Sequence, residues 1–411
     1  MTTELRKPTA VRPTRREFLA AAALSPFAVS IGRSQEEQAL QKPKSLGTSS
    51  VATILRKRAL EGLSEMELCE PSLATSSTRA RLEKELSLIE HLGLSNDLLT
   101  AYDLVHHYGE PGFLALGHEV EHCSLVAFVL GIVRVSPNSQ ELTYEDFAYE
   151  INLKRRISLD VCSLRWDELV EDNPESLQTL RIVPKLCLTL IHRIHTLIRS
   201  THNGTLFGLE IPLDDPATYQ MLSRGETEGI PFFDQLQSHQ ALCRLRPEWF
   251  HELVAFCALE YGWFDSPATW DLIAAKHDHV RPAWPAPIAK ALTSTYGQVL
   301  YREQAFRIIQ ELLFCDYESA ARIWSELSNP AHSKYATSRD LLGTAAQRTG
   351  MGELLMASIF EQFDRINCDC DSRALGVNAA FYDYTLAYLK AHFPAEFNEA
   401  WQQLRAEQIL A

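Results

Sequence analysis

Helical periodicity is the sequence feature that most constrains the fold of this chain. In residues 51–63 and 78–94, leucine and isoleucine recur at spacings of three and four residues, as on the buried face of an amphipathic helix. From about residue 205 onward, nearly every segment carries the same pattern. Because 46% of the 411 residues are hydrophobic, the chain can bury a substantial core. These observations predict a folded, mostly helical protein.

Three short segments depart from the helical pattern. Residues 112–117 (GFLALG) are apolar and bounded by glycine, and residues 157–162 (ISLDVC) alternate as a strand does. Residues 180–188 (LRIVPKLCL) form a third candidate strand, in which Pro184 predicts a sheet edge or an early end because proline has no N–H to donate. Residues 123–133 are apolar all round, which predicts a buried helix.

The predicted fold class is therefore α+β and predominantly α. We expect a largely disordered leader over residues 1–50 and a small mixed α/β part over residues 51–204. An all-helical domain should follow over residues 205–411, with Asp214 and Asp215 as the candidates for the N-cap of an early helix.

Composition disfavours several classes of function. The net charge of −14 gives the chain no general attraction for phosphate backbones, so we expect weak or no DNA binding. Nine cysteines lie at irregular spacings, which is typical of reduced thiols rather than of a disulfide framework. A lone pair, Cys368 and Cys370, is a weak signal for a metal site.

The N-terminal segment has the features of an export signal. Residues 14–30 contain Arg15 and Arg16 followed by a short apolar run, as in a twin-arginine leader. The run is too short to span a membrane stably, and the rest of the chain contains no candidate span. The alternative is an alanine-rich leader without a targeting role.

Residues 118–122 spell a zinc-protease motif, H-E-x-x-H. On a helix, His118 and His122 would share a face and bind zinc, while Glu119 would activate water. We favour a chance match, because the chain has 14 histidines and His118 should lie before, or in the first turn of, the helix that follows. Zinc hydrolysis is kept as an alternative.

Several long segments, in order, resemble one known family, the bacterial DNA polymerase III alpha subunit. Its palm is resembled by RLEKELSLIEHLG, CSLVAFVLGIVRVSP and LTYEDFAYEINLKRRISLDVC, and its fingers by IPLDDPATYQMLSRGETEGI and RLRPEWFHELVAFCAL. The resemblance implies a palm–fingers fragment. The family's N-terminal metal-dependent domain and C-terminal modules are not matched, and residues 171–176 stand where the family has a long insert that includes the thumb.

The resemblance also implies where a polymerase site would lie. The family holds two metal ions with three aspartates, two of them one residue apart on the strand that corresponds to 157–162. Here Asp160 is the sole retained aspartate, while Ser158 and Arg181 occupy the other two positions. Arginine would repel Mg²⁺. This comparison predicts an impaired catalytic site.

The family's phosphate-binding positions are also altered. A Gly-Arg-Gly-Ser loop of the family is matched only by Gly117, because His118, Glu119 and Val120 replace its other residues. Of a basic segment in the fingers, only Arg373 remains as a weak candidate for binding nucleotide phosphates.

Our leading hypothesis is a DNA polymerase III alpha-like protein that has lost activity, has no cofactor and acts by binding a replication or repair partner. Whether it is an enzyme stays open, because the alternative is residual polymerase activity with Mg²⁺, using Asp160 and a carboxylate from Asp167 or Glu168. The family implies a cytoplasmic protein, and the leader offers export as the alternative. The oligomeric state is not predictable from the sequence.

Overall fold

A computed structural model describes the positions of most of the chain. The described residues are 48–69, 75–108, 115–165, 169, 171, 179–201, 211–260, 267–278, 282–366 and 372–407. The leader with Arg15 and Arg16, the Cys368–Cys370 pair, and Asp167 and Glu168 lie outside these ranges. Predictions that rest on them are neither supported nor contradicted by the structure.

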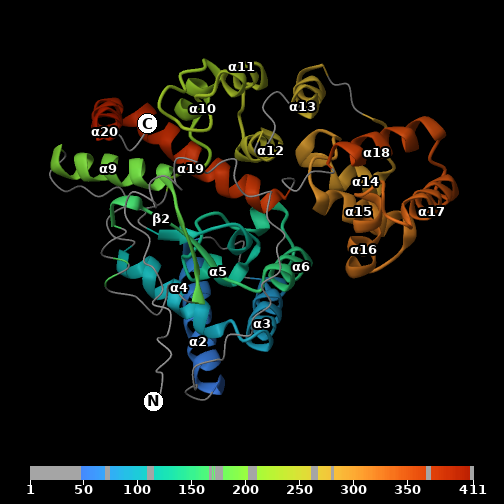
Figure 1. The fold of residues 1–411 in the computed structure, drawn as a ribbon, viewed down its shortest axis with the longest axis horizontal. Coiled ribbons are helices and arrows are strands. Elements are labelled where there is room, and N and C mark those ends of the chain that lie inside the picture. Colours follow the sequence, from blue (N-terminus) through green and yellow to red (C-terminus); the bar gives the residue numbers. More distant parts are fainter. Residues whose placement is uncertain are drawn as a thin grey trace, which may run out of the picture.

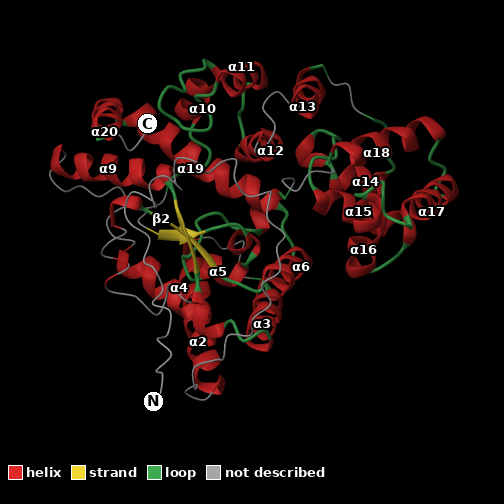
Figure 2. Ribbon diagram, in the orientation of Figure 1, coloured by secondary structure: helices red, strands yellow, loops and turns green. Residues whose placement is uncertain are grey.

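Helices dominate the fold, and the only sheet in the described part is small (Figures 1 and 2). The first half contains α2 (Thr48–Cys69), α3 (Ser76–His91), α4 (Ser95–Tyr108), β1 (Ala115–Gly117), η2 (Val120–Cys123), α5 (Leu125–Val129), η3 (Asn138–Gln140), α6 (Tyr144–Lys154), β2 (Ser158–Val161), η4 (Ser163–Arg165), β3 (Arg181–Pro184) and α9 (Leu186–Thr201). The second half contains α10 (Pro216–Ser223), α11 (Leu236–Leu245), α12 (Phe250–Glu260), α13 (Pro267–His277), α14 (Ala286–Ala291), η5 (Thr293–Thr295), α15 (Arg302–Leu313), α16 (Tyr317–Leu327), α17 (Tyr335–Arg348), α18 (Glu353–Arg365), α19 (Arg373–His392) and α20 (Pro394–Ala406). The predicted fold class, α+β and predominantly α, is confirmed.

The sheet has the strand order β1-β2-β3, with β1 antiparallel and β3 parallel to the central strand β2. The strand predicted at 157–162 is confirmed as β2. The edge strand β3 ends at Pro184, as the missing N–H of proline predicts. Of the segment 112–117, the structure describes only Ala115–Gly117, which is β1.

Local sequence signals also account for the ends of several helices. Asp215 is the N-cap of α10, and its carboxylate accepts the Thr218 N–H at 2.8 Å, as predicted. Thr143 and Asp146 form a capping box at the start of α6. Of the segment 123–133, which was predicted as a buried helix, Leu125–Val129 form the helix α5, and all five of these residues are buried.

Two hydrophobic cores hold these elements together. The larger core runs from Leu55 to Leu404 and includes residues on both sides of position 205. The smaller core lies between Trp284 and Ile366 and is built from α14 to α18. Figure 1 shows the helices of the smaller core to one side of the molecule. The domain boundary expected near 205 stays a prediction.

Helix α19 connects the late part of the chain to the sheet. Sixteen of its twenty residues are buried, because it packs against α12, α9, α10 and η2. Gly376 permits a close approach to α12: a Cβ atom there would lie 2.6 Å from the Val254 carbonyl oxygen. The helix therefore carries its side chains directly over the sheet.

We expect Gly376→Ala to lower the free energy of unfolding by about 1–3 kcal/mol, because a methyl group would overlap backbone that cannot move aside. Gly343→Ala in α17 is the matched control: no atom lies within 4 Å of its added Cβ, so alanine should stabilise the helix by about 0.5–1 kcal/mol. Urea titration of both variants measures the difference. Equal effects would contradict the packing argument.

In the part of the chain that the structure describes, no helix is both long enough and apolar enough to cross a membrane.

Candidate functional site

Asp160 lies at the centre of the sheet and is completely buried. It sits on β2, opposite Leu116 of β1 and Val183 of β3. On the same strand, Ser158 is paired in register with Arg181 of β3. Since side chains two apart on a strand share a face, and so do register neighbours in a parallel pair, Ser158, Asp160 and Arg181 project from one face of the sheet.

Both carboxylate oxygens of Asp160 contact other side chains. Oδ1 lies 2.8 Å from Nδ1 of His118. Oδ2 accepts hydrogen bonds from Asn378 Nδ2 at 3.1 Å and from the Tyr382 hydroxyl at 2.9 Å, and Lys185 Nζ lies 4.0 Å from it. Asn378 and Tyr382 are four residues apart on α19 and therefore share a face of that helix. Helix α19 thus covers the carboxylate.

The charges in this cluster stabilise one another. Burial raises the pKa of Asp160, but the neighbouring His118 and Lys185 outweigh it and hold the pKa well below its usual range. For His118, burial lowers the pKa, while Asp160 and the contact with Glu119 raise it to about 9. Asp160 and His118 are consequently a carboxylate and an imidazolium at neutral pH.

The H-E-x-x-H residues do not form a helical zinc site. His118 precedes η2, a short 3₁₀ helix, in agreement with the predicted loop position. Its ring faces Asp160 and Glu119, whereas His122 Nε2 lies 3.2 Å from Asn378 Nδ2. Glu119 also pairs with Lys154 at 3.2 Å. Within the described ranges, no group of three or more histidine, cysteine, aspartate or glutamate side chains is placed to hold a metal ion.

Glu121, another residue of this segment, has a structural contact. Its Oε1 accepts the backbone N–H of Ser158 at 2.8 Å, so it ties the loop to the start of β2. Burial raises the pKa of Glu121 to about 7. Burial also lowers the pKa of His122 to about 3, so that this ring is neutral at physiological pH.

The two residues predicted to bind phosphate, Gly117 and Arg373, both contact other parts of the chain. A Cβ atom on Gly117 would lie 2.6 Å from Val133 Cγ1, so glycine is needed there for packing. Arg373 is buried; its Nη1 donates to the Gln140 carbonyl at 2.7 Å and pairs with Glu141 at 2.5 Å, while its guanidinium lies over the Tyr301 ring. A nucleotide-binding role for Gly117 and Arg373 stays a prediction.

Sequence reasoning missed Lys185, Asn378 and Tyr382, which all reach Asp160. Asn378 and Tyr382 did carry a signal, since both are polar groups inside an otherwise apolar helical segment. That pattern indicates buried polar partners but does not say where they are.

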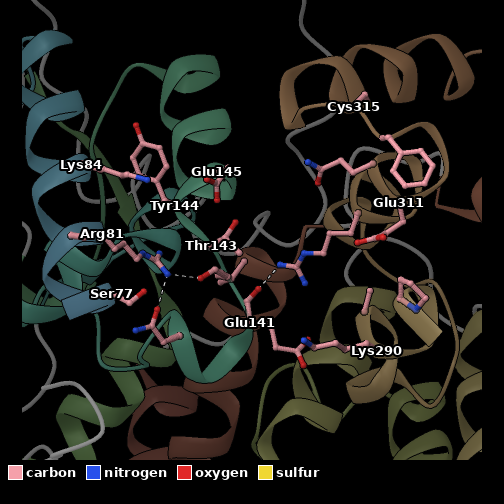
Figure 3. Close-up of a pocket in the computed structure, with 18 residues that line it drawn as sticks. Ser77, Arg81, Lys84, Glu141, Thr143, Tyr144, Glu145, Lys290, Glu311 and Cys315 are labelled. Atoms are coloured by element: carbon pink, nitrogen blue, oxygen red, sulfur yellow. Dashed lines mark hydrogen bonds between the residues drawn. The ribbon is translucent and has the colours of Figure 1, made fainter. Parts of the chain in front are cut away.

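Charged residues also join the regions of the two cores. Two arginines of α15 pair with carboxylates of the segment 141–150, Arg302 with Glu150 and Arg307 with Asp146. Beside them Arg373, the first residue of α19, pairs with Glu141. Glu141 and Arg307 of this seam also line a cleft of about 970 Å³. One wall of the cleft comes from α3 and α6, and the other from α14 and α15. Figure 3 shows Lys84 and Tyr144 on the first wall and Glu311 and Cys315 on the second.

Two family models match consecutive stretches of the chain. A model described as the bacterial DNA polymerase III alpha NTPase domain matches residues 53–171, and one described as the bacterial DNA polymerase III alpha subunit finger domain matches residues 187–350. Together they cover more than half of the chain. The chain belongs to the bacterial DNA polymerase III alpha subunit family. The resemblance inferred from the sequence is thereby confirmed.

Curated DNA polymerase III alpha subunits match about half of this chain. The subunit of Aquifex aeolicus is 28% identical over 212 residues, which is 51% of this chain and 18% of that protein. The subunit of Rickettsia bellii is 30% identical over 190 residues, and that of Escherichia coli K12 is 27% identical over 197 residues. These two matches cover 46% of this chain and 16% and 17% of the relatives. The matched region thus spans less than a fifth of each of the three.

The polymerase III alpha resemblance assigns the catalytic aspartates to the positions of Ser158, Asp160 and Arg181. The sheet brings these three positions to one face, as a shared site requires. Only one of them is a carboxylate, and the side chains around it are Tyr382, Asn378 and two cations. Chemically, the cluster is suited to holding the sheet, the 118–122 loop and α19 together.

We expect stability to depend on the His118–Asp160 pair between pH 7 and 9. The pKa of His118 is raised from 6.5 in the unfolded chain to about 9, so its stabilising charge is fully present below pH 6.5 and is lost as the pH rises towards 9. This predicts a loss of about 2 kcal/mol between pH 7 and pH 9. Urea titrations across this range should show that loss in the wild type, whereas His118→Gln should remove most of it.

His91→Gln, at the exposed end of α3, is the matched control for this measurement and should leave the pH dependence unchanged. Parallel stability curves for the wild type and His118→Gln would contradict the prediction.

Proposed function

We propose that this member of the polymerase III alpha family is catalytically impaired and acts by binding. The observation that carries the proposal is the state of Asp160. Its carboxylate is buried and takes two hydrogen bonds from α19, and His118 and Lys185 supply the positive charge beside it. These contacts occupy the positions from which a metal ion would be bound.

The residues present do not fit a two-metal polymerase site. Such a site needs several carboxylates that are open to the ions and to the substrate phosphates. The neighbouring position on the same strand is Ser158, and the one beside it on β3 is Arg181, whose charge opposes a cation. We therefore propose no step through Mg²⁺ and no other cofactor.

Primer extension tests the proposal directly. The purified full chain is mixed with a primed template, all four deoxynucleoside triphosphates, and Mg²⁺ or Mn²⁺. We expect no extension product from folded protein. Extension that disappears in Asp160→Asn would overturn the proposal and support a site rebuilt around Asp160, while extension that persists in the variant would indicate a contaminating polymerase.

The binding partner that we propose is a replication or repair protein in the cytoplasm. The family membership and the two intact cores support it, since a folded surface persists where the catalytic residues do not. A leader–reporter fusion tests the alternative of export: a reporter that leaves the cytoplasm only when Arg15 and Arg16 are intact would favour export instead.

We expect the purified chain to contain far less than one zinc ion per molecule, because His118 and His122 face different partners. Elemental analysis after dialysis against a weak chelator measures this, with a known zinc protease as the positive control. Stoichiometric zinc that is lost in His122→Gln would revive the hydrolase alternative.

A further inference from the structure

A thiol and an imidazole lie side by side on α11, far along the chain from the Asp160 cluster. His239 and Cys243 are four residues apart, so they share one face of this helix. His239 Nε2 lies 4.0 Å from Cys243 Sγ, and His239 Nδ1 lies 3.4 Å from Thr227 Oγ1. Both side chains are partly exposed, whereas Thr227 is buried. Cys243, His239 and Thr227 thus contact one another in a row, as a nucleophile, a base and a group that orients the base.

We propose that Cys243 is a reactive thiol, with His239 as its proton acceptor, and that hydroperoxides oxidise it. When Nδ1 carries the proton and donates it to Thr227 Oγ1, the lone pair of Nε2 faces the thiol. This is the arrangement of an activated cysteine: the imidazole takes the S–H proton while a third group holds the ring. The 4.0 Å separation shortens as the proton is transferred, as it does in catalytic pairs that are loose before they react.

The step balances with a hydroperoxide as the oxidant. The sulfur of Cys243 attacks one oxygen of the peroxide, an S–O bond forms and the O–O bond breaks. His239 accepts the thiol proton and returns it to the leaving oxygen. The products are a cysteine sulfenic acid and water, or an alcohol when the peroxide is organic.

The acceptor is needed because of the position of Cys243. It lies in the last turn of α11, away from the free N–H groups at the start of the helix that could contact a negative sulfur. The proton must therefore leave as the sulfur attacks, which makes the reaction depend on His239.

The other partly exposed cysteines of the described ranges lie beside carboxylates. Cys187 has the Asp383 carboxylate 3.9 Å from its sulfur, and Cys315 lies beside Asp316. Burial and these carboxylates raise the pKa of both thiols.

Oxidation of Cys243 would affect the turn that follows α10, because this turn lies against the thiol. Gly225 is in the left-handed region at φ +74°, and a Cβ atom there would lie 2.6 Å from Cys243 Sγ and 2.4 Å from His239 Cε1. The turn therefore lies directly against both reactive groups. An added oxygen on Sγ that points towards Gly225 has no room there unless the turn or the His239 ring moves.

Thiol labelling of the native full chain tests the proposal. Iodoacetamide is added in limiting amount at pH 7, and the label on each cysteine is measured by peptide mass spectrometry. We expect Cys243 to react about tenfold faster than Cys315, and His239→Gln to lower the Cys243 rate by about the same factor. Thr227→Val should lower it by a smaller factor, because the ring is then no longer oriented. His91→Gln is the control that should change nothing.

Hydrogen peroxide followed by dimedone then identifies the product. Dimedone reacts with sulfenic acids, so its adduct should appear on Cys243 in the wild type and decrease with His239→Gln. A Cys243 labelling rate equal to that of Cys315, or a rate that His239→Gln leaves unchanged in folded protein, would overturn the proposal. Because the label on each cysteine is measured in the same sample, partial unfolding of a variant is visible as faster labelling of the buried Cys123 and Cys162.

Discussion

Replacing Asp160 by alanine should lower the free energy of unfolding by about 3–5 kcal/mol. The substitution removes the Asp160 carboxylate from the buried His118 imidazolium and from the partly buried Lys185. It also leaves the Tyr382 hydroxyl and the Asn378 amide without their acceptor in the core. Chemical unfolding followed by circular dichroism measures the loss.

The sign of this effect separates the proposed function from its alternative. A working active site holds carboxylates close together for chemistry and at a cost in stability, so replacing one of them commonly stabilises the protein. A carboxylate that has become part of the core does the opposite. Asp340→Ala, at an exposed position of α17, is the control and should change stability by no more than about 0.5 kcal/mol. A more stable Asp160→Ala variant would contradict the structural role that we assign to this residue.

Replacing Asp146 by alanine should have an effect of similar size, about 3–5 kcal/mol, at the seam between the two cores. The Asp146 side chain is fully buried and caps α6, accepting from the Thr143 N–H at 2.7 Å. It also accepts from the Tyr317 hydroxyl at 2.8 Å and pairs with Arg307 at 3.3 Å. One substitution therefore removes one half of the capping box of α6 and two contacts with the smaller core.

Differential scanning calorimetry measures this effect. We expect the unfolding transition of Asp146→Ala to move to lower temperature and to broaden, because the smaller core loses one of its connections to the larger one. Asp316→Ala is the matched control: it removes the N-cap of α16 but no seam contact, and it should cost only about 1 kcal/mol. If Asp146→Ala and Asp316→Ala lower the stability equally, the contacts of Asp146 with the smaller core contribute nothing to it.

The elements near the site were predictable because their signals are local. Alternation over 157–162 predicted β2, the missing N–H of Pro184 predicted the end of β3, and the apolar run in 123–133 predicted the buried helix α5. Ordered similarity along the chain predicted the family. Each of these inferences depends on residues within one element or on the order of elements, and both are written in the linear sequence.

The surroundings of Asp160 depend on contacts between distant residues. Asn378 and Tyr382 reach its carboxylate from 218 and 222 positions away, because α19 returns across the sheet. His118 belongs to a segment that resembles a zinc motif, yet its ring turns towards Asp160 instead. The sequence therefore determined the helices and the strands, and the resemblance to the family predicted that two of the three catalytic carboxylates are replaced. Only the tertiary structure decided what surrounds the remaining one, because partners from far along the chain are selected by packing and charge and leave no local periodicity.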